Sequence, residues 1–544
     1  LPRGNWGGSL LKKHAGAYTG RYPSHGCPLQ MMAFNLGEAG LYLAAHDGAA
    51  RAKELAVSAE QDATFRLLAE NAGVPGAAGG PDYPVVIAAY RGDWWQAARR
   101  YREWASRQAW TSKGLIRERA DYPQRLEDLG FWMLLGGEPA SVTNNMAKAA
   151  RLYPGLPLGV HWYNWHQIPF DHSYPEYFPT KAGMAEATRA MEGGGQTVMP
   201  YINARLWDRD IPSFGGAYAA ACKQPTGTNY VETYGSGRNL VPMCPATAQW
   251  QATVQAVCER LMRDCGVGGI YLDQIGSAAP VACHDRSHGH PAGGGRHWVD
   301  GYHAMLRGVK AEAARRGVAL TTEDSAEPYM DVVDGCLAWN PRYQEDVPLL
   351  PAVYSGYTIY FTSPQAPQDS ADAFCAAQAR DFLWGCQLGW NGDWILHEPH
   401  REKQQFQLAL CRYRQAAKAF LVYGQLVDEA RPLAEVPETA HRWHRNQPHT
   451  ARLPAVMGTV WRDAGGRLAV IVVNASAQPQ AFDFSVEPAR WLNSRGPWRL
   501  SSLTPEGEFD VGAECASRVH LGDLQPREIR VLVIRQKSAG RSGR

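Results

Sequence analysis

Residues 268–276 have the sequence GGIYLDQIG, a short apolar run between glycines that ends in the carboxylate of Asp273. This pattern predicts a buried strand that delivers an acid at its C-terminal end. Residues 246–265, just before it, carry apolar side chains at helical spacing, and Gly266 suits the end of that helix. In parallel βα barrels the chemistry lies at the C-terminal ends of the strands. We therefore predict a catalytic role for Asp273, with the capping of a following helix as the alternative.

The same succession of strand and helix repeats from about Gly130 to Leu426. Eight candidate strands fit an α/β fold of the (β/α)8 TIM-barrel type. A doubly wound sheet would usually have fewer strands and a glycine-rich phosphate turn after the first, and the sequence contains no such turn. The candidate strands are 131–135, 158–163, 197–202, 269–272, 318–322, 332–337, 352–358 and 386–390.

Residues on both sides of this repeat alternate between apolar and polar types, which predicts antiparallel β-sandwich domains. Residues 1–115 are assigned to an N-terminal sandwich that ends in a linker helix after Asp93. Residues 116–430 are assigned to the catalytic barrel and residues 431–544 to a C-terminal sandwich.

Composition narrows the function. A formal net charge of +2 gives no general attraction to nucleic acid, and no apolar run is long enough to span a membrane. The 11 cysteines form no CxxC pair, which favours free buried thiols over a disulfide framework. The 19 tryptophans favour a carbohydrate ligand, because indole faces stack on sugar rings. The start at Leu1, without Met, suggests processing, and we expect a secreted or periplasmic protein rather than a cytoplasmic one.

A glycosidase needs a second carboxyl group near Asp273. Retaining enzymes hold the two carboxyls about 5–5.5 Å apart, and inverting enzymes about 6.5–9.5 Å. Glu323 ends the next candidate strand, and adjacent barrel strands bring their C-terminal ends together, so Glu323 is the predicted acid. The rival candidates are Asp324, Glu327, Asp331 and Asp334.

Polar and aromatic residues gather at the predicted strand ends, including Trp339 and Asn340. Core packing does not explain so many polar groups at equivalent places, and a pocket that binds sugar does. For each aromatic residue, ordinary core packing is the alternative. The predicted substrate-binding residues are His161, Trp162, Trp165, Asp171, Asn203, Arg205, Trp207, Gln274, His288, His290 and Trp390.

Four histidines and a cysteine lie close together in residues 283–297. Such a stretch raises the question of zinc, but its spacing matches no standard zinc pattern and the chain contains no HExxH motif. We therefore predict no metal and no cofactor. The stretch is expected to form a loop over the pocket, with His288 or His290 in contact with a sugar hydroxyl or with Asp273.

Several of these segments resemble those of bacterial barrel glycosidases of the α-galactosidase and endo-α-N-acetylgalactosaminidase superfamily. The similarity lies in Tyr271–Gln274, in His161–Trp165 with Asp171 and the following 174–179, and in the loop 287–291. The resemblance implies that Asp273 is the nucleophile and Glu323 the acid. Classical members of the α-galactosidase type use instead an Asp after the sixth strand, and no equally clear Asp stands there in this sequence. The resemblance also implies retention at an α-linkage.

The predicted function is hydrolysis of an α-glycosidic bond, of the α-galactoside or α-N-acetylgalactosaminide type, in an oligosaccharide or glycoconjugate. Asp273 attacks the anomeric carbon and Glu323 protonates the leaving oxygen, then activates water. One alternative is a non-catalytic carbohydrate-binding protein on a degenerate barrel. The other is a metal-dependent hydrolase that uses the histidine-rich loop. No nucleic-acid partner and no membrane span are predicted.

Overall fold

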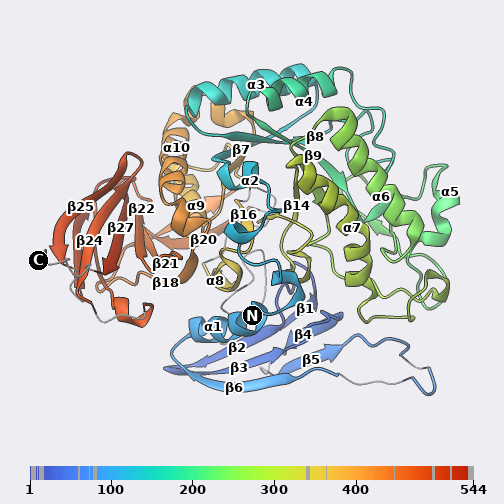
Figure 1. The fold of residues 1–544 in the computed structure, drawn as a ribbon, viewed down its shortest axis with the longest axis horizontal. Helices are drawn as coiled ribbons and strands as arrows, with labels where there is room; N and C mark the ends of the chain where they lie inside the picture. The colour runs from blue at the N-terminus through green and yellow to red at the C-terminus, as the bar shows by residue number, and fades with distance from the viewer. Residues whose placement is uncertain are drawn as a thin grey trace, which may run out of the picture.

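The computed structural model of the protein describes residues 1, 8, 10, 17–58, 62–72, 74–77, 82–338, 344–362, 364–445, 448–492, 496–514 and 518–536. Three regions follow one another along the chain (Figure 1). Antiparallel sheets of the N-terminal region lie below the barrel in that view, and those of the C-terminal region lie at its left.

The N-terminal region consists of two three-stranded antiparallel sheets. One has the order β1-β4-β5 and the other β2-β3-β6. Inward and outward residues alternate along β1 and β4, as a sheet with one face against a core requires. The strands are β1 (Tyr18–Tyr22), β2 (Met31–Leu36), β3 (Ala39–Ala45), β4 (Lys53–Val57), β5 (Ala63–Leu67) and β6 (Val85–Arg91).

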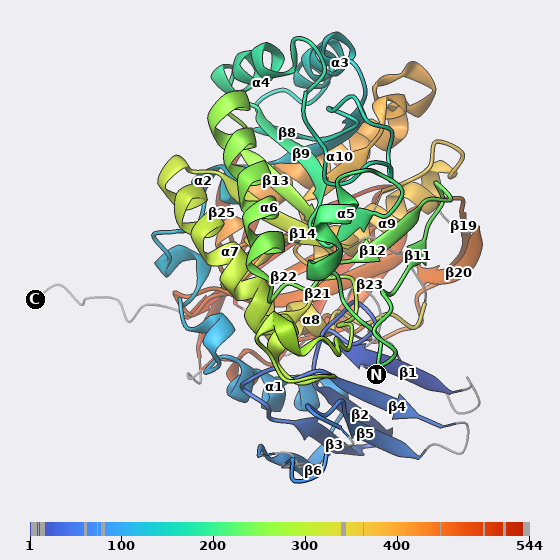
Figure 2. The same cartoon turned by 90° about the vertical axis from the view of Figure 1, so that its right-hand side faces the viewer.

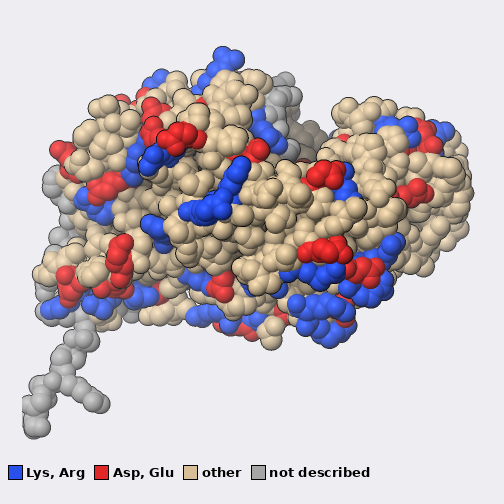
Figure 3. Space-filling view, turned by 90° about the horizontal axis from the view of Figure 1, so that it is seen from above, with Lys and Arg blue, Asp and Glu red and all other residues tan. Residues whose placement is uncertain are grey.

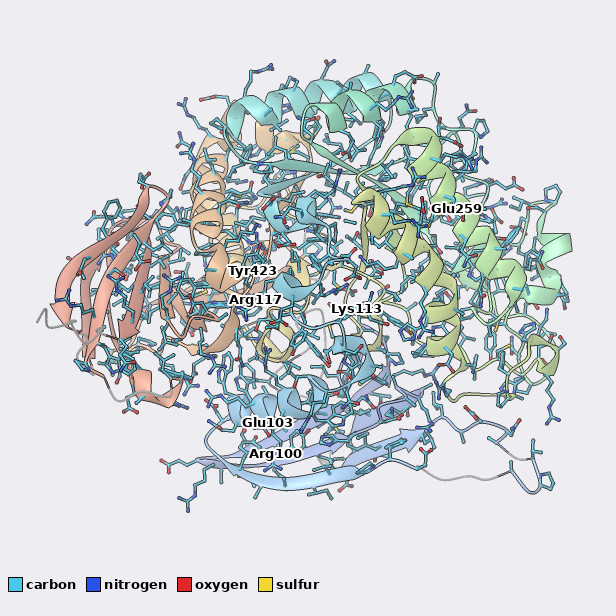
Figure 4. The ribbon with its side chains drawn as sticks, in the orientation of Figure 1. Arg100, Glu103, Lys113, Arg117, Glu259 and Tyr423 are labelled. Atoms are coloured by element: carbon cyan, nitrogen blue, oxygen red, sulfur yellow. The ribbon has the colours of Figure 1, made fainter. Side chains whose placement is uncertain are left out.

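Helix α1 (Trp94–Ala105) lies between these sheets and the barrel (Figure 1). It begins where predicted, because the Asp93 side chain accepts a hydrogen bond from the backbone N–H of Trp95 at 3.1 Å. Lys113 and Arg117, labelled in Figure 4, lie on the connection that follows α1 toward the barrel. The Lys113 ammonium donates to Asp121 and to the backbone oxygen of Asp331, both at 2.7 Å, and so ties this connection to the barrel.

The barrel is an eight-stranded parallel sheet with the order β16-β15-β14-β13-β9-β8-β7-β17. A parallel bridge between Phe361 and Gln387 joins its two edges. Its strands are β7 (Phe131–Gly136), β8 (Leu158–Tyr163), β9 (Thr197–Asn203), β13 (Gly269–Asp273), β14 (Ala319–Glu323), β15 (Gly335–Leu337), β16 (Ile359–Phe361) and β17 (Leu388–Asn391). The predicted TIM barrel with flanking β-sheet regions is confirmed.

Helices cover the outside of the barrel (Figures 1 and 2). They are α3 (Pro139–Leu152), α4 (Met184–Gly193), α6 (Ala248–Arg260), α7 (His297–Arg316), α9 (Ala371–Leu383) and α10 (Arg401–Ala416), and the short α2 (Gln124–Asp128) precedes the first barrel strand. Tyr423, labelled in Figure 4, donates from its hydroxyl to the Glu127 carboxylate of α2.

One predicted strand is wrong. Residues 352–358 begin with the second half of helix α8 (Leu349–Tyr354), and the seventh strand of the barrel begins only at Ile359. Every residue of α8 is buried, so this short helix is apolar on all sides. Periodicity cannot distinguish such a helix from a buried strand.

A small antiparallel sheet is inserted between β9 and α6 (Figure 2). It has the order β10-β12-β11, with β10 (Leu206–Asp208), β11 (Glu232–Thr233) and β12 (Asn239–Pro242). Because it follows the C-terminal end of β9 directly, it lies on the side of the barrel where Asn203 and Asp273 end their strands.

The C-terminal region contains a six-stranded antiparallel sheet and two pairs of strands. The large sheet has the order β18-β21-β22-β27-β24-β25, and the pairs are β19-β20 and β23-β26. Their bounds are β18 (Gln425–Glu429), β19 (Glu438–Trp443), β20 (His449–Pro454), β21 (Val456–Arg462), β22 (Leu468–Asn474), β23 (Gln480–Ser485), β24 (Trp498–Thr504), β25 (Gly507–Glu514), β26 (Arg518–Leu524) and β27 (Ile529–Gln536). The domain boundaries at residues 115 and 430 stay predictions.

Two tryptophans fasten the C-terminal region to barrel helix α9. The indole N–H of Trp443 donates to the backbone oxygen of Ala373 at 3.0 Å, and that of Trp461 to Leu383 at 3.1 Å. Acidic and basic side chains are interspersed on the face shown in Figure 3, which agrees with the near-neutral net charge. Within the described ranges, no helix has the length and apolar character needed to cross a membrane.

Candidate active site

Asp273 and Glu323 end two neighbouring parallel strands of the barrel. In the register of β13 and β14, Leu272 lies beside Thr322, so the two acids are the next residues along. Their carboxyl groups lie close enough for each to act on the pKa of the other. The predicted pair is therefore brought together at the C-terminal side of the barrel.

The Asp273 carboxylate is held by two side chains of β9. The Tyr201 hydroxyl donates to Oδ2 at 2.9 Å, and the Asn203 amide nitrogen donates to the same oxygen at 3.1 Å. The Asn203 amide is itself oriented, because its oxygen accepts from the backbone N–H groups of Arg205 and Leu206 at 3.0 and 2.9 Å. Both donors favour the ionised form of Asp273.

Glu323 has a different environment. The Ser277 hydroxyl donates to its Oε2 at 2.6 Å. The backbone oxygen of Ser277 in turn contacts Nδ1 of His25 at 2.7 Å, so the N-terminal region reaches the site. Gly276 makes this approach possible: a Cβ atom there would lie 2.6 Å from the backbone oxygen of Asp324 and 2.8 Å from that of Glu323.

Burial sets the proton affinity of the pair. It raises the pKa of Asp273, the charge of Glu323 raises it further, and the Tyr201 hydroxyl lowers it. Burial also raises the pKa of Glu323, while Ser277 and His25 lower it. Two buried acids that act this strongly on one another do not ionise independently, so the pair titrates as a unit.

A third carboxyl group and a tyrosine lie near this pair. Burial raises the pKa of Asp171, and the charge of Glu323 adds to the effect. The Tyr163 pKa is raised by burial and then by Asp273 and Glu323, while Arg445 lowers it. Arg445 follows strand β19 of the C-terminal region, so this region also contributes to the surroundings of the pair.

Arg205 and Gln274 support the site from the side of the inserted sheet. The Arg205 guanidinium makes two hydrogen bonds of 2.6 Å to the Glu232 carboxylate and a third, of 3.2 Å, to the Gln274 side-chain oxygen. Gln274 has a φ of 68°, which turns the chain sharply after Asp273. Arg205 was predicted to bind the sugar, but its guanidinium donates two of its hydrogen bonds to the Glu232 carboxylate.

Of the predicted aromatic residues, His161 and Trp390 lie inside the barrel. The His161 ring contacts those of Trp390, Tyr163 and Tyr271 at centroid distances of 4.6, 4.4 and 4.5 Å. Neither ring nitrogen of His161 has a hydrogen-bond partner among the described residues. His161 therefore offers two unused polar atoms beneath the carboxyl pair.

The other three tryptophans that were predicted to bind substrate pack away from the carboxyl pair. Trp162 is fully buried and donates to the backbone oxygen of Gly137 at 3.1 Å, and Trp165 donates to that of Tyr201 at 2.8 Å. Trp207, in strand β10 of the inserted sheet, packs against Trp250 of helix α6. Since successive residues of a strand point to opposite faces, an inward His161 places Trp162 outward. These three indoles have core positions.

His288 and His290 do not contact Asp273 in any described interaction. His288 lies beside Cys283 and His290 beside Cys244. The expectation of a histidine-lined lid over the carboxyl pair therefore finds no support in these contacts. Trp339 and Asn340 lie outside the described residues.

The rival acids have other partners or positions. Asp334 binds the Lys310 ammonium at 2.6 Å and the backbone N–H of Leu320 at 2.9 Å. Asp331 contacts the His303 ring at 3.0 Å. Glu327 is buried and accepts hydrogen bonds from Tyr101, Tyr354 and Gln30.

Five residues around the carboxyl pair were not predicted from the sequence. Tyr201 had a usable signal, because it precedes Asn203 by two positions and so shares its face of the strand. Tyr163 lies in the segment 161–165 and Ser277 directly follows residues 268–276, but nothing local marked either residue. His25 and Arg445 come from the flanking regions, and only the folded chain brings them here.

The family model described as "Domain of unknown function (DUF6259)" matches residues 80–364, more than half of the chain. The chain belongs to this family. A "Putative glycoside hydrolase" of Bacteroides thetaiotaomicron is 31% identical over 393 residues, which cover 71% of this chain and 57% of that protein. "Putative glycoside hydrolase 22789" of Monosiga brevicollis is 32% identical over 438 residues, which cover 70% and 36%. The matched DUF6259 chain thus spans only part of the length of these relatives.

Solved structures share the fold of this DUF6259 protein. The ligand-free α-N-acetylgalactosaminidase NagBb of Bifidobacterium bifidum is 14% identical, covers 82% of this chain and 74% of its own, and has a TM-score of 0.60. The GH36 α-galactosidase AgaA of Geobacillus stearothermophilus is 10% identical, covers 98% and 74%, and has a TM-score of 0.56. The resemblance indicated by the sequence is thereby confirmed at the level of the fold.

Proposed function

We propose that this protein is a glycoside hydrolase that cleaves an α-glycosidic bond with retention of configuration. The observation that carries the proposal is the close approach of the Asp273 and Glu323 carboxyls at the ends of adjacent parallel strands, where each acts on the pKa of the other. Two carboxyl groups this close together suit a retaining enzyme, because an inverting enzyme holds them further apart to leave room for a water molecule beside the base.

The hydrogen bonds favour one assignment of roles. Asp273 accepts from Tyr201 and Asn203, which stabilise a carboxylate, so Asp273 is the nucleophile. Glu323 receives one hydroxyl, from Ser277, and has fewer donors to stabilise its charge, so it is assigned the role of general acid.

The reaction then has two displacements. An Asp273 oxygen bonds to the anomeric carbon as the bond to the leaving oxygen breaks, and that oxygen takes the proton of Glu323. The Glu323 carboxylate next removes a proton from water, whose oxygen bonds to the same carbon and displaces Asp273. Both acids return to their starting states, and two inversions give net retention.

The names of the structural neighbours support an α-galactoside or α-N-acetylgalactosaminide substrate. Asp171 lies near the pair and has a carboxyl group that suits sugar hydroxyls. The two free ring nitrogens of His161 add a donor and an acceptor below it. Trp390 is fully buried, so we assign it to shaping the floor through His161 rather than to open stacking.

The first test is hydrolysis of a panel of aryl α- and β-glycosides by the wild type, Asp273→Ala and Asp331→Ala. Asp331 is a matched control, because it is one of the rival acids from the sequence and contacts His303 instead of the pair. We expect release of one α-sugar with the α-anomer formed first by NMR, loss of activity in Asp273→Ala, and near-normal activity in Asp331→Ala.

Azide distinguishes the two roles. In Asp273→Ala, azide should replace the missing nucleophile directly and yield a β-glycosyl azide. In Glu323→Ala, azide should attack the covalent intermediate and yield an α-glycosyl azide. The opposite pairing of products would reverse the assignment.

A different result would refute the proposal. If the wild type hydrolyses no member of the panel and no longer glycan, yet binds sugars on a glycan array, the protein is the carbohydrate-binding protein of the alternative. Formation of the inverted anomer would refute the retaining mechanism while leaving the hydrolase intact.

A further inference from the structure

Two cysteines and two histidines from distant parts of the chain meet beside the inserted sheet. Cys244, Cys283, His288 and His290 each point one ligand atom into the cluster, and these atoms all lie within 4.8 Å of one another. Both cysteines are buried. Cys244 follows strand β12, and the other three residues belong to the connection from β13 to α7.

The distances between ligand atoms suit a tetrahedral metal site. Sγ of Cys283 lies 3.4 Å from Nδ1 of His288, and Sγ of Cys244 lies 3.3 Å from Nε2 of His290. Zinc bonds of about 2.3 Å to sulfur and about 2.0–2.1 Å to nitrogen, at tetrahedral angles, place such a pair roughly 3.6 Å apart. The four side chains therefore surround a volume of the right size for one ion.

Both imidazoles are oriented as metal ligands are. The outer nitrogen of His288, Nε2, lies 2.6 Å from the backbone oxygen of Ala219, and that of His290, Nδ1, lies 2.7 Å from the backbone oxygen of Pro291. Each outer nitrogen must carry the proton to make its hydrogen bond, so each inner nitrogen presents a lone pair to the cysteines. His290 is held further by His297, whose ring stacks on it at 4.0 Å.

A fifth candidate, Cys222, adjoins the cluster without completing it. It lies close enough to Cys244 and Cys283 for both to raise the pKa of its thiol, but it is not one of the four mutually close ligands. All three cysteines are free thiols. Thiols this close together can also oxidise, so a disulfide is the competing outcome.

We propose that Cys244, Cys283, His288 and His290 bind one zinc ion in a closed structural site. Two sulfur and two nitrogen ligands in a tetrahedral arrangement are typical of zinc. Four protein ligands leave no open position for water or substrate, which separates this site from a catalytic metal. The proposal replaces the expectation, drawn from residues 283–297 alone, that this loop binds no metal.

The ion would join the long loop after β13 to the inserted sheet. That loop begins next to Asp273 and carries Ser277, the residue that donates to Glu323. Its far end reaches the N-terminal region, where the Asn71 side chain accepts from the backbone N–H of Ala292 at 3.2 Å. Zinc would thus fix the middle of a segment whose two ends are already held.

The test is the metal content of the full chain, purified without a histidine tag or chelator and measured by mass spectrometry of the elements. We expect about one zinc per chain in the wild type, and its loss in Cys283→Ser and His290→Ala. Cys222→Ser and His284→Ala are the matched controls, from the same surroundings but outside the ligand set, and should keep the metal. Cobalt exchanged for zinc should give the intense visible bands of a tetrahedral site with thiolate ligands.

Two results would overturn the proposal. One is a wild-type protein that holds no zinc and takes none up from added zinc chloride. The other is a disulfide among Cys222, Cys244 and Cys283 in the unreduced protein, found by peptide mass mapping. If the ligand variants fail to fold, the cobalt spectrum of the wild type decides alone. None of these measurements depends on glycosidase activity, so this proposal and the proposed function fail separately.

Discussion

Tyr201→Phe isolates one hydrogen bond of the proposed nucleophile. The Tyr201 hydroxyl donates to Oδ2 of Asp273 at 2.9 Å, and this bond lowers the pKa of the acid. A hydrogen bond to a charged group contributes about 1.5–3 kcal/mol. At 1.36 kcal/mol per pKa unit, its loss should raise the pKa of the pair by about one to two units.

The direction in which the pH profile shifts depends on which protonation state of Asp273 reacts. Attack requires the Asp273 carboxylate, so activity falls where the pair becomes protonated. The acid limb of kcat/KM should move to higher pH in Tyr201→Phe, and activity at a fixed pH below both limbs should fall about 10- to 100-fold. The assay is kcat/KM against pH on an aryl α-glycoside that the wild type hydrolyses.

Tyr329→Phe is the matched control. The Tyr329 hydroxyl is also buried but has no hydrogen-bond partner among the described residues, so its loss should leave the acid limb in place. An unmoved acid limb in Tyr201→Phe would refute the claim that this bond stabilises the nucleophile. Equal shifts in both variants would point to a general loosening of the barrel.

Three further predictions follow from single contacts. Glu323→Gln removes the proton donor, so kcat/KM on substrates with poor leaving groups should fall about 10²- to 10⁴-fold, and less on aryl glycosides with acidic phenols. Gly276→Ala places a Cβ atom 2.6 Å from the backbone oxygen of Asp324, so it should lower kcat and shift the pH profile through Glu323, whereas Ala at the open Gly215 should do neither. Burial raises the pKa of Glu327 from 4.5 to about 7, so the folded chain keeps this proton between those pH values while the unfolded chain releases it. The free energy of unfolding should therefore fall by about 3 kcal/mol from pH 4.5 to above 7, and Glu327→Gln should remove that part of the pH dependence in urea titrations.

The barrel could be predicted because its strands are short apolar runs that stop at polar residues. The run before Asp273 and the one before Glu323 gave both the strands and their order, and parallel register then placed the two acids side by side. The seventh strand was misplaced because helix α8 is buried all round and has no polar face to reveal its period.

The site was only partly predictable. Alternation along β8 shows that His161 and Trp162 cannot both face the pocket, although both were predicted to bind substrate. The ion pair of Arg205 with Glu232 joins the turn between β9 and β10 to strand β11, 27 residues further along the chain, which no local spacing shows. The cluster of Cys244 with residues 283–290 was hidden for the same reason, since one ligand comes from a different connection of the barrel.

His25 of the N-terminal region and Arg445 of the C-terminal region both belong to the surroundings of the carboxyl pair. A flanking β domain can be exchanged without changing the site of a barrel only if it contributes no residue to that site. Here, an exchange of the N-terminal region would remove the residue that contacts the loop of Ser277, and an exchange of the C-terminal region would remove the charge beside Tyr163. The three regions are therefore expected to be inherited together, and a barrel expressed alone would lack both contributions to the surroundings of the carboxyl pair.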